Sequence, residues 1–276
     1  MIMNALQVPA DRLNAFCSEA FQALNVPEQD ADIVASNLVE AELRGLSSHG
    51  VMRLHAYLSK LEHAGYNPTP DIRIVRERPS LVVIDGDNGL GAVAGTRAMS
   101  LCLEKAKATG IACAAVGGGN HFGIAAFYSM MALNAEMIGI SMCNATPKVA
   151  VWGSRQPVLG TNPLSIAVPA AKRWPLVFDA ATSILARGKI IMADAEGKPL
   201  PPGAALDQDG NPTLDPKQAL TGILVPFGEH KGSGISIMID VLSALLSGAF
   251  YSMQIPELFS DFSQGQNVGF FFGAID

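Results

Sequence analysis

Apolar positions in the first 65 residues recur at helical spacing and predict three helices. The first helix shows its apolar side at Leu13, Phe16, Cys17, Ala20 and Leu24. The second is expected at residues 27–43, with Pro27 at its start, and the third at residues 50–63, because Gly65 ends the pattern. The chain therefore begins with a helical part.

Short apolar runs beyond residue 70 are typical of β-strands and alternate with further helices. Strands are predicted at residues 72–76, 81–85, 111–116, 138–143, 164–168, 176–178 and 269–273, and helices at residues 92–109 and 124–134 and from Gly234 onwards. Residues 199–216 are rich in Pro, Asp and Gly and form a predicted loop that is too long to be a mere connection. This pattern predicts a mixed α/β fold.

The most apolar run of the sequence covers residues 234–251. It contains Asp240 and several small polar residues. A membrane span rarely carries a carboxylate in its middle, so we interpret this run as a buried helix.

Charged residues are scarce in this chain. They make up 16% of its 276 residues, below the roughly 25% that is usual in soluble domains. So few charges would cover a monomer sparsely, and we therefore expect part of the surface to be buried against another subunit. The net charge of −6 and the lack of a basic stripe make nucleic acid and anionic membranes unexpected partners.

The cysteines and histidines do not form the spacings of disulfide or metal frameworks. Cys17, Cys102, Cys113 and Cys143 are scattered, which is typical of reduced thiols in a cytoplasmic protein. Residues 1–16 lack a continuous apolar stretch, so no secretory signal is expected. The five histidines contain no H-E-x-x-H pattern and no serine lies in a G-x-S-x-G elbow, so neither a metal site nor a serine nucleophile is expected.

The stretch Ser47-Ser48-His49-Gly50 with Arg53 is the first candidate site. His49 and Arg53 are four residues apart at the start of the predicted third helix, so both should project from one face. Histidine can give a proton to a developing alkoxide or amine, and arginine can hold a carboxylate through two hydrogen bonds. Spacing alone equally allows a capped helix with a surface histidine, and both interpretations stay open at this point.

Four further clusters combine glycine with polar residues beside apolar runs. They are Gly117-Gly118-Gly119-Asn120-His121-Phe122-Gly123, Gly89-Leu90-Gly91 with Gly95, Gly160-Thr161-Asn162-Pro163, and residues 227–234 with His230 and Lys231. Glycine lets a ligand approach the backbone and a helix N-terminus attracts phosphate, but each cluster also fits a turn. The cluster at Gly89 lacks the G-x-G-x-x-G spacing, and the next predicted strand ends in glycines rather than an acid, which argues against a Rossmann fold.

Taken in this order, these clusters resemble the malate/L-lactate dehydrogenase family, which includes sulfolactate and ureidoglycolate dehydrogenases and cyclic-imine reductases. The resemblance covers nearly the whole chain, through Arg44-Gly45, Ser48-His49-Gly50-Val51, Asp85-Gly86, Asn120-His121-Phe122-Gly123, Gly160-Thr161-Asn162-Pro163, Phe178-Asp179-Ala180-Ala181-Thr182-Ser183, Gly188-Lys189, Lys198-Pro199-Leu200-Pro201 and His230-Lys231-Gly232. It implies a sulfolactate dehydrogenase-like fold, with a mixed α/β, largely antiparallel sheet, a non-Rossmann cofactor domain and a helical N-terminal part. It also implies a homodimer.

The resemblance assigns roles to individual residues. It implies that His49 is the proton donor, that Ser48 orients it and that Arg53 holds the substrate carboxylate, while Thr161 lies near the substrate. The residues implied at the cofactor site are Asn120, His121, Asp179, Ala180, Ala181, Thr182, His230 and Lys231. Ser47 is left as a spacer or helix cap.

The implied domain organisation has two parts. Residues 1–70 form the helical part that carries His49 and Arg53 and packs with residues 230–276, and residues 71–229 form the cofactor-binding α/β domain. Family members continue for some dozens of residues beyond the predicted last strand, and their tail contributes to the cofactor site. We therefore expect this family tail to be absent here, either because the sequence is a fragment or because the protein is naturally shortened; in the second case nicotinamide binding is expected to be weakened or lost.

Two local signals disagree on the substrate. Residues 224–233 resemble the Δ1-piperideine-2-carboxylate/Δ1-pyrroline-2-carboxylate reductases, whereas Lys189 stands where those reductases have the aspartate of a Ser-His-Asp relay. We expect NAD(P)H-dependent reduction of a small 2-imino acid to the L-amino acid. The alternative is an NAD(P)-dependent 2-hydroxy acid dehydrogenase of the malate/L-lactate type, and an alternative of another class is a non-catalytic, truncated homologue that binds or dimerises. The cofactor is expected to be NAD or NADP, with NADPH preferred, although no ribose-reading residue is identifiable outside a Rossmann frame.

Overall fold

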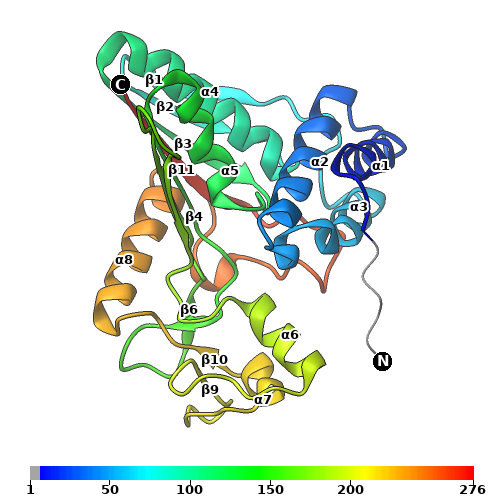
Figure 1. Ribbon diagram of the computed structural model, residues 1–276, viewed down its shortest axis with the longest axis vertical. Helices are drawn as coiled ribbons and strands as arrows, with labels where there is room; N and C mark the ends of the chain where they lie inside the picture. Colours follow the sequence, from blue (N-terminus) through cyan, green and yellow to red (C-terminus); the bar gives the residue numbers. More distant parts are fainter. Residues whose placement is uncertain (1–6) are drawn as a thin grey trace.

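The computed structural model describes residues 7–276 and is built around a seven-stranded sheet (Figure 1). In spatial order its strands are β1 (Arg73–Arg78), β2 (Leu81–Asp85), β3 (Ile111–Gly119), β11 (Val268–Ile275), β4 (Ile138–Cys143), β7 (Leu164–Val168) and β8 (Leu176–Ala180). Neighbouring strands run antiparallel apart from the parallel pair β2 and β3. The mixed α/β fold with a largely antiparallel sheet is therefore confirmed, and the strand order is not that of a Rossmann fold.

The N-terminal helices and the sheet share one hydrophobic core. Helices α1 (Ala10–Gln22) and α2 (Glu28–Leu43) form as predicted, and α4 (Gly91–Thr109) and α5 (Ala125–Ser129) cover one face of the sheet (Figure 1). Buried side chains of the helices, such as Phe21 and Leu38, belong to the same apolar cluster as Phe270 and Phe272 of β11. The predicted helix at residues 124–134 is the short α5 followed by the 3-10 turn η3 (Met130–Ala135).

The third predicted helix begins with a 3-10 turn. Two 3-10 turns, η1 (Ser47–His49) and η2 (Val51–Arg53), precede α3 (Leu54–Glu62), and Gly50 between them has an extended ψ of −143°. A Cβ at Gly50 would lie 2.3 Å from Glu42 Oε1, and the same Glu42 oxygen accepts the Val51 N–H. The predicted helix from Gly50 to about His63 is therefore present, with η2 as its first turn, and the half-buried Glu42 carboxylate holds the chain just before it.

A small second sheet lies below the first and has its own apolar cluster. Its strands are β6 (Pro157–Leu159), β5 (Val149–Ala150), β10 (Ile223–Leu224) and β9 (Ala205–Leu206), and helices α6 (Arg187–Glu196) and α7 (Pro216–Thr221) pack with it (Figure 1). Ile190 of α6 is completely buried in this cluster, with Val149 and Leu224 among its other members. The long loop predicted at residues 199–216 lies here and contributes β9.

The apolar run at residues 234–251 is not buried as predicted. Helix α8 (His230–Asp240) and the π-helical turn η4 (Val241–Leu245) cover the face of the large sheet opposite α4 and α5 (Figure 1). Ser236 and Ile239 are buried against that face, but Met238 is 54% and Leu245 56% exposed. The prediction failed because a helix that packs on one side only leaves its other apolar side uncovered. No helix among residues 7–276 is long and apolar enough to cross a membrane.

Candidate active site

Ser48 and His49 meet in the first 3-10 turn and are both half-buried. Ser48 Oγ lies 3.0 Å from His49 Nδ1, so this contact occupies one ring nitrogen and leaves Nε2 for a ligand. Burial, and then the charge of Arg53, lowers the pKa of His49 to about 4. The imidazole is therefore neutral at pH 7 and can accept a proton as it stands.

Arg53 brings an unneutralised positive charge beside this histidine. Its Nε donates to the Ser48 carbonyl at 2.7 Å, and its guanidinium carbon lies 4.9 Å from the centre of the Phe259 ring. Within residues 7–276, Arg53 forms no ion pair. A partly buried guanidinium without a carboxylate is suited to receive the carboxylate of a ligand through its two terminal nitrogens.

His121 lies against His49 rather than at a distance from it. The two rings stack with centroids 5.7 Å apart, and Tyr57 Oη lies 2.5 Å from His121 Nδ1. The backbone N–H of His121 donates to Gln266 Oε1. Burial, reinforced by Arg53 and His49, holds the pKa of His121 well below its usual value, so this ring is neutral too. The structure thus places His121 among the proposed catalytic residues.

Asn120 is completely buried and bonded to neighbouring loops. Its Nδ2 donates to the carbonyls of Asn88 and Gly89, and its Oδ1 accepts the Gln266 N–H at 2.6 Å. The amide therefore ties its own loop to the loops at Asn88 and Gln266. The structure gives Asn120 this loop-holding role, and the cofactor contact that the sequence implied for it stays a prediction.

Thr161 and Thr182 form a second group of candidate residues. The Thr182 N–H and hydroxyl both donate to the Thr161 carbonyl, at 2.8 and 3.0 Å, and the Thr182 carbonyl accepts the Phe227 N–H. This last bond connects the segment Asp179, Ala180, Ala181 and Thr182 to the turn that opens α8. The Asp179 carboxylate accepts the Ala126 N–H, which lowers its pKa. Desolvation has the larger effect and raises the pKa of Asp179 to about 6.

His230 and Lys231 stand exposed in the first turn of α8. A Cβ at Gly232 would lie 2.0 Å from the Phe227 carbonyl oxygen, so only glycine permits this close turn before the helix. A lysine ammonium beside the positive end of a helix is a donor set that suits a phosphate group.

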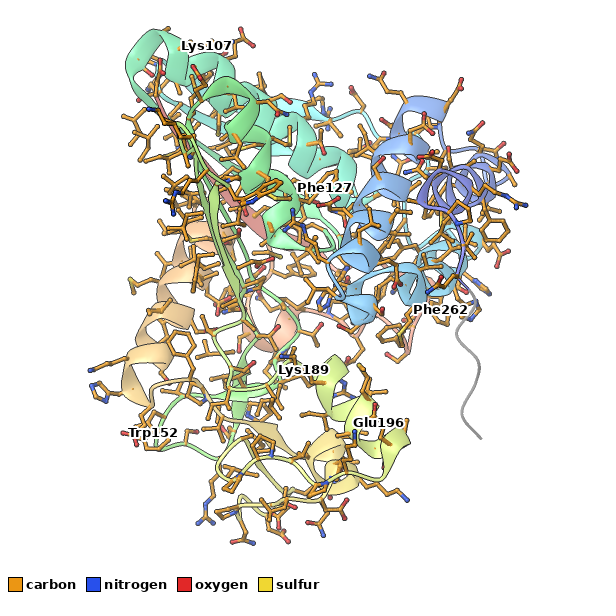
Figure 2. All side chains as sticks on the ribbon, in the orientation of Figure 1. Lys107, Phe127, Trp152, Lys189, Glu196 and Phe262 are labelled. Atoms are coloured by element: carbon orange, nitrogen blue, oxygen red, sulfur yellow. The ribbon has the colours of Figure 1, made fainter. Side chains whose placement is uncertain are left out.

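The amino end of α6 connects the histidine side to the small unit. A Cβ at Gly188 would lie 2.2 Å from Ser48 Cβ. The pKa of Arg53 is lowered mainly by burial; Tyr57 raises it, and the nearby charge of Arg187 lowers it further. Figure 2 shows Lys189 at the upper end of α6, where the small unit meets the rest of the molecule. No metal-binding group of His, Cys, Asp and Glu occurs in the described part of the chain.

Sequence reasoning missed several side chains that complete this site. Tyr57 follows Arg53 by four residues on a helical segment, so spacing could have indicated it. Phe259 lies 206 residues from Arg53 and Gln266 lies 145 residues from His121, and neither carried a motif that could have found it.

A neutral imidazole beside a guanidinium without an ion pair is an arrangement suited to the class of enzymes that exchange a proton with a bound small acid. Comparison with known proteins then gives the family. The model described as malate/L-lactate dehydrogenase matches residues 8–276, and the chain belongs to this family. It is therefore a dehydrogenase-family oxidoreductase that uses NAD(H) or NADP(H).

Individual relatives cover most of the chain. It is 44% identical over 281 residues to a malate dehydrogenase of Pyrococcus horikoshii, covering 99% of this chain and 77% of the relative. The sulfolactate dehydrogenase structure from Methanocaldococcus jannaschii superposes with a TM-score of 0.92 at 39% identity, covering 98% of this chain and 78% of that one. The Δ1-pyrroline-2-carboxylate/Δ1-piperideine-2-carboxylate reductase of Pseudomonas syringae pv. tomato is 39% identical over 228 residues, with 81% and 66% covered. The sulfolactate dehydrogenase-like fold is confirmed.

Proposed function

We propose that the protein interconverts a small 2-hydroxy acid and its 2-oxo acid with a nicotinamide cofactor. The observation that carries this proposal is the half-buried, unpaired Arg53 next to the neutral His49. The relatives named as malate and sulfolactate dehydrogenases support the 2-hydroxy acid alternative more than the imine reduction that the sequence analysis put first.

Arg53 is proposed to hold the substrate carboxylate. Two hydrogen bonds from its terminal nitrogens would fix the acid beside the His49 ring, and positioning of this kind accounts for a large part of enzymatic rate enhancement. The stacked Phe259 ring limits where the guanidinium can move, so the clamp is held in one place.

His49 is proposed to exchange the substrate proton at Nε2. In the oxidation direction its neutral ring takes the proton of the hydroxyl group at C2. In the reduction direction the proton returns to that oxygen, which requires the imidazolium. Burial and then the charge of Arg53 lower the pKa of His49, and a carboxylate bound to Arg53 offsets the second of these causes, so substrate binding shifts the equilibrium towards the protonated form.

The cofactor is proposed to lie along the group formed by Asp179, Ala180, Ala181, Thr182, His230 and Lys231, near Thr161. Lys231 and the glycine-dependent turn into α8 suit its phosphates, and the bound cofactor supplies or accepts the hydride at C2. We propose NADPH as the preferred form, since the exposed Lys231 can also neutralise an additional phosphate. A cytoplasmic homodimer is the proposed assembly, supported by the scarcity of charge and the exposed apolar side of α8.

A second candidate function is reduction of a cyclic 2-imino acid. The motif at His230-Lys231-Gly232-Ser233 and the identity to the Pseudomonas reductase favour it. Lys189 opposes it, because a lysine at the amino end of α6 cannot replace the aspartate of a Ser-His-Asp relay.

The test is a substrate panel with both cofactors. Oxidation of NADH and NADPH is followed with pyruvate, oxaloacetate, Δ1-pyrroline-2-carboxylate and Δ1-piperideine-2-carboxylate. We expect the 2-oxo acids to be reduced at the higher kcat/KM. A higher value with the imines would support the second candidate, whereas no turnover and no change in cofactor fluorescence would support the non-catalytic alternative.

A further inference from the structure

The hydrogen bonds at His121 determine which of its nitrogens carries the proton. The Gly123 N–H donates to His121 Nδ1 at 3.3 Å, and a backbone N–H can only donate. Nδ1 must therefore present a lone pair. Tyr57 Oη, at 2.5 Å from the same nitrogen, must then donate its own proton. Both contacts place the ring proton on Nε2.

His49 is held less strictly. Among residues 7–276, its Nδ1 has one hydrogen-bond partner, the Ser48 hydroxyl, which can either donate or accept. Both tautomers of His49 are therefore compatible with its surroundings, as a proton-exchanging group requires. The two stacked imidazoles differ in this respect: one can change its protonation pattern and the other is fixed.

The fixed proton of His121 lies on the ring edge that faces away from Tyr57 and Gly123. Nδ1 is directed at Tyr57 and Gly123, so Nε2 is on the opposite edge of a half-exposed ring. Within residues 7–276, no hydrogen bond to this Nε2 occurs, so the group is free to bind a ligand. The centroids of the two rings lie 5.7 Å apart, so a small molecule bound to one imidazole lies beside the other.

We propose that Tyr57 is a positioning residue that fixes His121 with its proton on Nε2, so that His121 donates a hydrogen bond to the C2 oxygen of a 2-oxo acid while His49 exchanges the proton. This inference rests on the proposed function and assigns a substrate class within it. A carbonyl oxygen accepts such a bond and gains negative charge during reduction, so the bond strengthens in the transition state. A protonated cyclic imine carries an N–H in place of this oxygen. Two donors, the imine N–H and the Nε2–H of His121, would then face each other and could not form a hydrogen bond.

The groups around His121 all keep the ring in this neutral, donating form. Arg53 and His49 from the 3-10 turns oppose a second positive charge, Tyr57 from α3 donates to Nδ1, and Tyr66 and Gln266 are neutral. No proton leaves His121 at any stage, because the proton that is transferred comes from His49.

The first experiment reads the tautomer directly, by 15N NMR of histidine-labelled protein. We expect His121 in the wild type to show protonated Nε2 and unprotonated Nδ1, and His121→Gln identifies its signals. In Tyr57→Phe we expect a mixture of the two tautomers. Tyr66→Phe is the matched control, because it removes a buried hydroxyl from the same cluster without touching Nδ1, and it should keep the wild-type tautomer.

The second experiment compares substrate classes. Tyr57→Phe should lower kcat for a 2-oxo acid by about 10- to 100-fold with little change in KM, and should lower kcat for a cyclic imine less, since a relaxed His121 can also present a lone pair. A proton on Nδ1 in the wild-type spectrum would overturn the proposal, as would equal losses for both substrate classes in a Tyr57→Phe protein with wild-type melting temperature. If the tautomer is as expected but no acid is turned over, the proposed function has failed and the role of Tyr57 in fixing His121 stands.

Discussion

The two sides of the proposed site differ in how their polar groups are held. On the histidine side, Tyr57, Asn120 and Gln266 fix the loops and rings through buried hydrogen bonds. On the α8 side, His230 and Lys231 are exposed, and within residues 7–276 their side chains form no hydrogen bond or ion pair. The difference indicates that the side performing proton exchange is preorganised, whereas the side proposed to hold the cofactor is completed by its ligand.

The largest expected effect comes from His49→Gln. Glutamine keeps a polar side chain of similar reach but cannot exchange a proton, so kcat should fall by about 100- to 10,000-fold. The measurement is kcat with a 2-oxo acid and with the corresponding hydroxy acid. His55→Gln, at an exposed position on α3, is the control and should behave as the wild type. A loss below threefold would remove His49 from the proton-exchanging role.

Arg53→Ala should lower kcat/KM by about 100- to 1,000-fold, mostly through KM, because the carboxylate loses two charge-assisted hydrogen bonds. Steady-state kinetics over a wide substrate range measure the division between KM and kcat. Arg12→Ala, on the exposed surface of α1, controls for the loss of a positive charge. An unchanged KM together with unchanged turnover would show that the carboxylate binds elsewhere.

Lys231→Ala tests the exposed α8 side of the site, which is proposed to hold the cofactor. Cofactor affinity should fall by about 10-fold while the KM of the acid stays near the wild-type value, because the lysine lies with the α8 group and not with Arg53. Titration of cofactor fluorescence measures the affinity, and Lys217→Ala on α7 is the matched control. If the KM of the acid rises and cofactor affinity does not change, the assignment of the two sides is reversed.

The smallest effect concerns stability. The pKa of His49 is about 4 in the folded protein against 6.5 for a free histidine, so between these values the unfolded chain binds a proton that the folded chain does not. Folding stability should therefore decrease as the pH falls from about 6.5 to 4. Urea unfolding at pH 7 and pH 5 measures the loss, which should be smaller in His49→Gln. An equal loss in the two proteins would mean that His49 is not held neutral in the fold.

The sequence predicted those parts of the molecule that depend on local pattern. The strands β2, β4 and β7 fall at the predicted residues because their apolar runs have sharp ends. Spacing marked His49 and Arg53 as a candidate pair, and the family resemblance added Ser48 and the role of each residue. Helix α7 was missed because its six residues show no periodicity, although Asp215 caps it and Pro216 begins it. The exposure of α8 was missed because hydropathy does not say which surface covers a helix. The role of Asn120 depends on loops that only the fold brings together, as does the contact of His121 with Tyr57.

The position of β11 has a consequence for the order of folding. This strand lies between β3 and β4, and it alone joins the half of the sheet formed by β1, β2 and β3 to the half formed by β4, β7 and β8. During synthesis neither half can pair with the other until residues 268–275 have left the ribosome. Contacts of such long sequence separation form slowly, so the unfinished chain would expose two open strand edges, at β3 and β4. The nascent protein should therefore depend on a chaperone during this interval. A protein whose central strand is synthesised early should depend on a chaperone less.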